Sequence, residues 1–527
     1  MRARPGLVYE TDRRTPPVLF HYGEGFRLET LPAGSRIVYP PEPVPALRDE
    51  RGAIARALDE PFEMEPLRAL LRPDMKLTIA FDDISLPLPQ MRQPDIRQLV
   101  IEQVVQLAAE AGVEDVELIV AQSLHRKMTP AEIRRAVGDR VFRAFWPERL
   151  RNFDAEDPDD LVFVGTTDHG EEVELCKRAM ESDLLVYVNI NLVAMDGGHK
   201  SVPVGLGTYR SLRHHHNVKT LLDSNSYMDP RHSALHRSTE RMGRFLADKL
   251  KIFHIETTLN NEAFPAPYDF LSKRAFEWSF RDQATYLALS SGLKRMKPAT
   301  KRKLFHSIEA PHRMTSVQAG QTDAVHAETL RNVHRQQLVP VQGQTDILTM
   351  GIPYVGPYNV NSVLNPILVV CMGLGYFFNL YRGAPLVRPG GVVILAHPTE
   401  REFHPTHHPS YIDFFDRVLA ETTDPAEIEK RFEADFASDP WYRHLYRNSY
   451  AYHGVHPFYM WYWAAHAMDH LGDAIFLGGD PKTVRRLGFR SASTLDDALE
   501  MAKQTVGLHP SITHLHCPPL FLPEVTP

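Results

Sequence analysis

The sequence predicts an α/β protein with two domains and mainly parallel sheets. Three observations support this prediction. The chain has 527 residues, whereas single hydrophobic cores stop growing at roughly 250–300 residues. Short apolar runs typical of buried strands alternate with amphipathic helical stretches, a pattern typical of crossover units in parallel sheets. Polar clusters directly follow several of these runs, where ligands bind in open parallel sheets.

The first regular unit begins after about 70 proline-rich residues. A buried strand is predicted at 75–81 (MKLTIAF) and a helix at 94–111, because its apolar residues recur at helical spacing. A second strand follows at 116–121. Thr129 and Glu132, with a proline between them, form a capping box that starts the next helix. Further along, the pattern predicts strands at 162–164 and 184–188 with a helix near 173–180 between them.

A second α/β unit follows a mixed, charged region. Its predicted elements are a strand at 345–350, a helix at 361–380, a strand at 392–396, an aromatic helical region at 442–471 and a helix at 494–506. We therefore expect an N-terminal domain at 1–295 and a C-terminal domain at 296–490. The last segment, 491–527, is expected to return to the N-terminal domain.

Composition argues against several classes of protein. The net charge of −7 does not favour a general nucleic-acid binder, which needs a basic face to displace counterions. Three widely spaced cysteines suit a reducing compartment. The start of the sequence lacks the apolar core of a signal peptide, and the longest apolar stretch, 367–378, is too short to span a bilayer. We expect a cytoplasmic protein with no nucleic-acid or membrane partner.

Polar side chains follow three of the predicted strands. These are Asp82 and Asp83, then His125, and then the loop 189–200 that ends in Gly197-Gly198-His199-Lys200. Several familiar motifs are absent from the sequence. It has no P-loop spacing, no GxGxxG after the first strand, no HExxH, no structural-zinc spacing and no GxSxG. A dehydrogenase that binds an exchangeable nicotinamide is therefore unsupported.

Four segments, in order, resemble motifs of the lactate racemase family. They are FDDISLP at 81–87, AQSLHRKMT at 121–129, VGTTDHGEEV at 164–173, and GGHKSVPVGLGTYRSLRHHHN at 197–217. The resemblance covers about residues 75–220, with a weaker echo at 387–400 and 493–502. It implies two α/β domains with the active site in the cleft between them. It also implies a racemase or epimerase that inverts C2 of a small-molecule 2-hydroxy acid by reversible hydride transfer.

The resemblance further implies a nickel-pincer nucleotide cofactor, pyridinium-3,5-bisthiocarboxylic acid mononucleotide with nickel, and hence cofactor-biosynthesis proteins as partners. Lys200 would tether the cofactor covalently and His216 would bind nickel. His125 would be the general acid/base, and a histidine suits this role near neutral pH. Asp82, Asp83, Gly197 and Gly198 would lie beside the nucleotide. Alternatives stay open: Lys200 as an ordinary loop cation, His216 on a solvated helix start, and the two aspartates as turn caps.

The sequence departs from the family at three places. Leu86 replaces an arginine, and the loop before Gly197 lacks the family's second acid/base histidine. His199, Asn191, water or a substrate hydroxyl would take that role. Asn361 and Asn365 occupy the substrate region, which favours a larger, polyhydroxylated, aldonate-like acid over lactate. Two other functions remain open: a non-catalytic homologue that binds a nucleotide or a partner, and a metal-dependent hydrolase using the histidine clusters.

Overall fold

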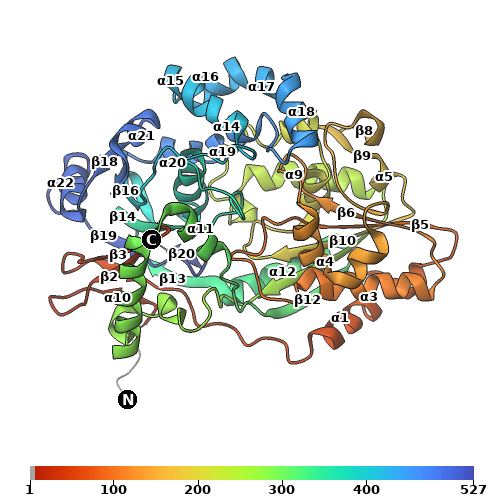
Figure 1. The fold of residues 1–527 in the computed structure, drawn as a ribbon, viewed down its shortest axis with the longest axis horizontal. Helices are drawn as coiled ribbons and strands as arrows, with labels where there is room; N and C mark the ends of the chain where they lie inside the picture. Colours follow the sequence, from red (N-terminus) through yellow and green to blue (C-terminus); the bar gives the residue numbers. More distant parts are fainter. Residues whose placement is uncertain (1–5, 527) are drawn as a thin grey trace.

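The computed structural model describes residues 6–526 and contains two large, mainly parallel sheets (Figure 1). The first sheet has the order β12-β11-β10-β5-β6-β7 and is parallel except for the antiparallel edge strand β12. The predicted α/β class is therefore confirmed. The strands are β5 (Lys76–Asp82), β6 (Asp115–Ala121), β7 (Leu150–Asn152), β10 (Leu184–Asn191), β11 (Ile252–Leu259) and β12 (Met314–Gly320).

Helices cover this sheet as the apolar spacing predicts. α3 buries Leu99, Val100 and Val104, and α4 begins with the expected capping box between Thr129 and Glu132. α12 packs against β11 and β12. The helices are α1 (Glu50–Asp59), α3 (Ile96–Glu110), α4 (Pro130–Phe145), α9 (Ala234–Ala247) and α12 (Thr322–Gln337), with short helices α2 (Leu67–Leu70), α5 (Lys177–Met180), α6 (Ser201–Gly205), α7 (Tyr209–Leu212) and α8 (Val218–Leu222).

The second sheet has the order β1-β4-β19-β14-β16-β17-β18, with β2 and β3 beside β14. Helix α22 packs against β16 and β17. A small sheet, β13-β20-β15, lies apart from this order. The strands are β1 (Val8–Glu10), β2 (Val18–Gly23), β3 (Phe26–Glu29), β4 (Arg36–Val38), β13 (Leu338–Gln342), β14 (Thr345–Pro353), β15 (Arg382–Gly383), β16 (Val387–Ala396), β17 (Asp473–Leu477), β18 (Arg490–Ala492), β19 (Ile512–Leu515) and β20 (Leu522–Thr526).

The remaining helices lie mostly in the second half of the chain. In Figure 1 the blue helices α14–α18 lie along one edge of the molecule, running from the second sheet toward the first. They are α10 (Phe280–Arg295), α11 (Pro298–His306), α13 (Pro366–Val370), α14 (Pro409–Asp413), α15 (Leu419–Glu421), α16 (Pro425–Ile428), α17 (Ala434–Ser438), α18 (Pro440–Asn448), α19 (His456–Tyr462), α20 (Ala465–His470), α21 (Pro481–Arg486) and α22 (Leu495–Val506). None of the helices in residues 6–526 combines the length and apolar character needed to cross a bilayer.

The strands of each sheet come from both sides of residue 295, where we expect the domain boundary. β12 pairs with β11, so the first sheet extends to Gly320, and β4 joins β19 in the second sheet. β19 also pairs with β14, so this part of the segment 491–527 belongs to the second sheet, beside the N-terminal strand β4. This arrangement could not be predicted from the sequence, because a short strand near a chain end does not indicate which distant strand it pairs with.

Three predicted helical regions need correction. Residues 172–176 form β9, which pairs antiparallel with β8 (Leu161–Thr166), and only Lys177–Met180 is helical. The helix predicted at 361–380 begins at Pro366 and continues as a π-helix, Cys371–Phe377. The region 442–471 contains α18, α19 and α20, because the chain leaves the helical path between Asn448 and His456.

Candidate active site

A cavity of about 230 Å³ lies between the two sheets. Its first wall comes from the carboxyl ends of β5, β6 and β10 and the loops after them. Its second wall comes from the loop after β14, the π-helix and α19. This is the position that open parallel sheets favour for ligands. Six of the predicted site residues line it: Asp82, Asp83, His125, Gly197, Lys200 and His216.

His125 and Asp83 form a hydrogen-bonded pair at the edge of this cavity. Nδ1 of His125 lies 2.8 Å from Oδ2 of Asp83, and the backbone N–H of Ser85 donates to the other carboxylate oxygen at 3.0 Å. Burial alone would raise the pKa of Asp83, but the His125 charge and the hydrogen bonds outweigh it and hold that pKa below its usual value. A charged carboxylate thus orients the imidazole and leaves Nε2 of His125 for proton transfer.

Lys200 lines the cavity at the end of a loop that only glycines can build. Gly197 and Gly198 have φ values of 81° and 67°. A Cβ on Gly197 would lie 2.2 Å from Oδ1 of Asn191, so a larger residue would displace the loop. Burial lowers the pKa of Lys200, although the charges of Asp196 and Asp82 oppose the shift. A lowered pKa raises the fraction of neutral, nucleophilic amine.

A buried carboxylate holds this loop in place through a hydrogen bond. It was not predicted from the sequence. Glu256 on β11 is fully buried. It accepts a hydrogen bond from the N–H of Gly198 at 2.6 Å and contacts Nδ1 of His326 at 3.1 Å. Burial opposes ionisation, but His326 and the Gly198 N–H hold the pKa of Glu256 below its usual value. A single carboxylate inside the buried strand (IFHIETTL) was the available signal.

Asp82 joins two strands of the first wall. Its carboxylate accepts the N–H of Ile190 at 2.7 Å and the side-chain amide of Asn189 at 3.0 Å. Burial, with smaller contributions from Asp196 and Asp83, raises the pKa of Asp82 to about 7. Asp82 therefore fixes the start of the loop that leads to Lys200.

His216 lies against aromatic rings of the second wall. Its ring centre is 5.2 Å from that of Tyr459 and 5.5 Å from that of Trp463. Its Nδ1 lies 2.6 Å from Nδ1 of His215, so Nε2 is the nitrogen available to a metal ion. Burial and the positive charge of Lys200 lower the pKa of His216 to about 3. A neutral imidazole is the form that binds metals.

Three other predicted residues lie outside the cavity lining. Nε2 of His199 lies 3.3 Å from Oδ1 of Asp323. The amide of Asn361 donates to Glu132 at 2.8 Å. Asn365 is fully buried as the N-cap of α13, where its Oδ1 accepts from two backbone N–H groups. All three side chains therefore make their contacts outside the cavity lining, and Gly198 contributes to the loop without lining the cavity.

Sequence reasoning missed most of the second wall. Tyr358 and Tyr376 line it with their hydroxyl oxygens 2.6 Å apart, and His456, Tyr459 and Trp463 line it from α19 and the residue after it. Tyr358 lies in the loop after β14, just as His125 lies in the loop after β6, so the same rule could have predicted it. The α19 residues recur at helical spacing, but their sequence, HPFYMWYW, is typical of an apolar core.

The lining is otherwise mainly apolar. Among residues 6–526, Lys200 is the only lysine or arginine that lines this cavity. The apolar side chains around it come from both walls: Leu86, Leu88, Val193, Met195, Leu212, Met228, Phe264, Met372, Phe377, Leu380, Met460 and Leu520.

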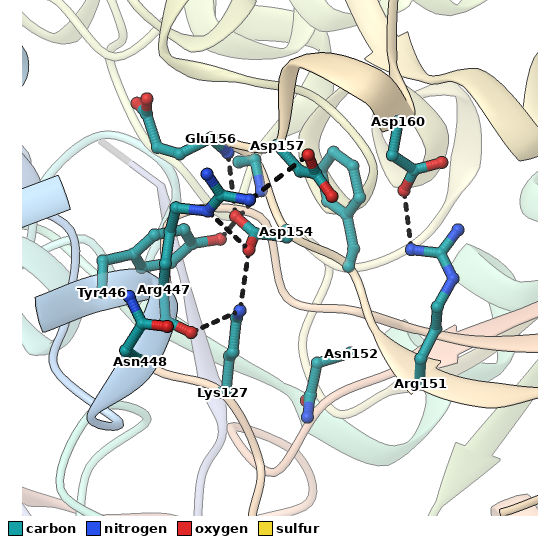
Figure 2. Close-up of polar contacts among 12 residues, drawn as sticks. Lys127, Arg151, Asn152, Asp154, Glu156, Asp157, Asp160, Tyr446, Arg447 and Asn448 are labelled. Atoms are coloured by element: carbon teal, nitrogen blue, oxygen red, sulfur yellow. Dashed lines mark hydrogen bonds and ion pairs between the residues drawn. The ribbon is translucent and has the colours of Figure 1, made fainter. Parts of the chain in front are cut away.

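A cluster of ion pairs outside the cavity joins α18 to the loops after β6 and β7 (Figure 2). Asp154, in the loop after β7, accepts hydrogen bonds from Lys127 at 2.9 Å and from Arg447 on α18 at 3.2 Å. The hydroxyl of the neighbouring Tyr446 donates to the carbonyl of Ser123 at 2.7 Å. These contacts attach α18 to the loop that carries His125.

Comparisons with known proteins agree with this fold. Residues 22–229 match the family model of the lactate racemase N-terminal domain. Lactate racemase from Thermoanaerobacterium thermosaccharolyticum is 24% identical over 172 residues, which cover 32% of this chain and 38% of that protein. The chain thus matches well under half the length of this curated relative.

Two solved structures resemble the whole fold. The apoprotein of the lactate racemase from T. thermosaccharolyticum superposes with a TM-score of 0.62 at 16% identity, covering 95% of this chain and 98% of that one. A protein from Thermotoga maritima gives 0.51 at 13% identity, covering 90% and 97%. The fold class is thus a two-sheet α/β architecture shared with a racemase. Residues 22–229 thus resemble the lactate racemase N-terminal domain, and the overall fold is similar to that of a lactate racemase.

Proposed function

We propose that this protein is an isomerase that inverts C2 of a 2-hydroxy acid with a nickel-pincer nucleotide tethered to Lys200. One observation carries the proposal: Lys200, His216 and the His125–Asp83 pair line a single cavity. These residues come from separate segments that only the fold brings together.

The side chains present fit such a cofactor. Lys200 is the amine that would form the thioamide, and its lowered pKa favours this acylation. Neutral His216 would supply an imidazole nitrogen, which is an acceptable nickel ligand. When bound, the cofactor supplies a reversible hydride acceptor, so that inversion avoids deprotonating a weakly acidic C–H bond.

The protein's own residues then manage the proton and the surroundings. His125 takes the proton of the C2 hydroxyl through Nε2 as C2 is oxidised, and returns it when C2 is reduced on the opposite face. Asp83 holds the imidazole in place and stabilises its protonated form. The apolar lining excludes water from the planar 2-keto acid.

For the substrate, we propose a 2-hydroxy acid with a large apolar side chain. The prediction of a polyhydroxylated, aldonate-like acid rested on asparagines, tyrosines and histidines, and of these Asn361 and Asn365 have their contacts outside the cavity. Leu86 and the other apolar lining residues would pack against an alkyl or aryl group. The aldonate remains the comparison substrate. Cofactor-biosynthesis proteins would load the chain, and we propose the cytoplasm as its location.

The alternative functions have less support. The part of the chain that the structure describes contains no group of three or more His, Cys, Asp or Glu side chains that could hold a metal ion, which disfavours a hydrolase built on the histidine clusters. A non-catalytic homologue would not need the His125–Asp83 pair.

The experiment follows one enantiomer of 2-hydroxy-3-phenylpropanoate, and separately gluconate, in deuterated solvent. The proposal predicts that the phenyl acid yields its opposite enantiomer with the original hydrogen retained at C2, detected by chiral chromatography and NMR. Lys200→Arg is the matched control and should give no inversion. Deuterium at C2 would contradict hydride transfer. Absence of inversion by a protein that carries the Lys200 adduct would contradict the function for these substrates.

A further inference from the structure

Three side chains along one face of α19 line the cavity, and each carries a polar atom. His456, Tyr459 and Trp463 are spaced three and four residues apart, so they share one side of the helical path. All three line the cavity, and their exposed fractions are only 2%, 2% and 3%. We refer to these three residues as the α19 row.

Each member of the α19 row has a buried polar atom without a partner. Nε2 of His456, Oη of Tyr459 and Nε1 of Trp463 make no hydrogen bond within residues 6–526. Buried polar groups are normally satisfied, because leaving one without a partner destabilises the folded protein. Other polar atoms of the same helix are satisfied: Tyr462 donates to Glu433 at 2.9 Å and Trp461 to the Thr423 carbonyl at 3.1 Å. On this helix, the unmet atoms therefore belong to residues that line the cavity.

All three atoms are hydrogen-bond donors. The indole N–H can only donate, and burial keeps Tyr459 protonated by raising its pKa. Tyr411 Oη lies 2.6 Å from Nδ1 of His456, and this is its only hydrogen bond to residues 6–526. Donation of the Tyr411 proton to Nδ1 satisfies both groups and leaves the hydrogen of His456 on Nε2. Three donors without an acceptor match an anionic oxygen ligand.

The α19 row also runs alongside the residues of the proposed reaction. The ring of His456 is 5.3 Å from His125, and those of Tyr459 and Trp463 are within 5.5 Å of His216. A 2-hydroxy acid held between the proton acceptor and the proposed nickel ligand would present its carboxylate to this row. Lys200, the only lysine or arginine of the lining among residues 6–526, is reserved for the tether.

We propose that the α19 row is the carboxylate-binding site for the substrate and that it binds the anion through neutral donors. This proposal rests on the proposed function only in placing the reacting acid between His125 and His216. Tyr411 is a positioning residue, because it sets which nitrogen of His456 carries the hydrogen.

The test compares binding of 2-hydroxy-3-phenylpropanoate with that of its carboxamide, measured by titration calorimetry on the full chain as purified. The wild type should bind the acid more than tenfold tighter. Tyr459→Phe and Trp463→Phe keep the rings and remove one donor each, so each should weaken binding of the acid about tenfold and spare the amide. His456→Gln, which keeps a donor, should bind the acid better than His456→Leu.

Tyr462→Phe is the matched control on the same helix and should leave the preference for the acid intact. Circular dichroism checks folding, and if one variant does not fold, the other ring-conserving variant decides. Equal binding of acid and amide by the wild type, or full preference in both Tyr459→Phe and Trp463→Phe, would overturn the proposal. Intact mass of Lys200 is read separately, so that a preference for the acid without an adduct refutes the proposed function alone.

Discussion

The carboxylates of the first wall are hydrogen-bonded, whereas each member of the α19 row on the second wall has a polar atom without a partner among residues 6–526. On the first wall, Asp83 is paired with His125, Asp82 bonds across to β10, and Glu256 holds the Gly198 N–H. On the second wall, the α19 row keeps three donors unpaired among aromatic rings. The first wall is therefore preorganised for chemistry before any ligand arrives. The second wall is completed only by a ligand, which is the behaviour expected of a recognition surface.

The largest effect is expected from removing His125, the proposed general base on the first wall. His125→Asn should lower kcat about 10²–10⁴-fold, because a positioned base contributes that much. Asp83→Asn should give a smaller loss, since the imidazole remains but loses its orienting charge. Steady-state kinetics of inversion measure both. Activity near the wild-type level in His125→Asn would assign the proton transfer to another group.

A smaller effect should follow from weakening the attachment of α18 to the loop that carries His125. Asp154→Asn removes the charge that Lys127 and Arg447 share (Figure 2). We expect the free energy of unfolding to fall by about 1–3 kcal/mol, as for other hydrogen bonds to charged groups. Urea titration measures this change. Asp139→Asn, which breaks an exposed ion pair on α4, is the control and should be nearly neutral. An equal effect of both changes would refute the special role of the contact.

The next prediction concerns Glu433, which lies behind α19. Burial raises its pKa to about 7, against the hydrogen bonds from Tyr462 and Tyr209. The folded state therefore binds a proton more tightly than the unfolded state does. Its contribution to stability is complete below pH 4.5 and is lost as the pH rises to about 7. Glu433→Gln should flatten this decline by about 2–3 kcal/mol, measured by unfolding at pH 4.5 and 8. An unchanged slope would contradict the raised pKa.

The smallest expected effect tests what lies outside the cavity. Asn361→Ala should leave KM and kcat unchanged, because the amide of Asn361 bonds to Glu132 rather than lining the cavity. A several-fold rise in KM would instead restore the substrate role predicted from sequence. His199→Gln should likewise leave KM and kcat unchanged, because His199 lies beside Asp323 outside the cavity lining.

The contrast between the walls also explains what the sequence could predict. Asp83, His125 and Lys200 directly follow strands or a glycine loop, so local patterns located them. His456 lies in a helix whose sequence is typical of an apolar core. Long-range contacts, such as that of Tyr446 with Ser123, determine which side of this helix faces the cavity. Asn365 was misassigned for the opposite reason, because a polar residue at a helix start can be a cap as readily as a ligand. The pairing of β12 with β11 could not be predicted from local patterns either.

The central claim is that Lys200 carries the cofactor. Intact-protein mass spectrometry with peptide mapping, on the chain purified from a host that makes the cofactor, tests this claim directly. The account predicts an added mass on the peptide that contains Lys200, with nickel in equal amount, and none on Lys200→Arg. An unmodified Lys200 in protein that inverts the substrate would contradict it.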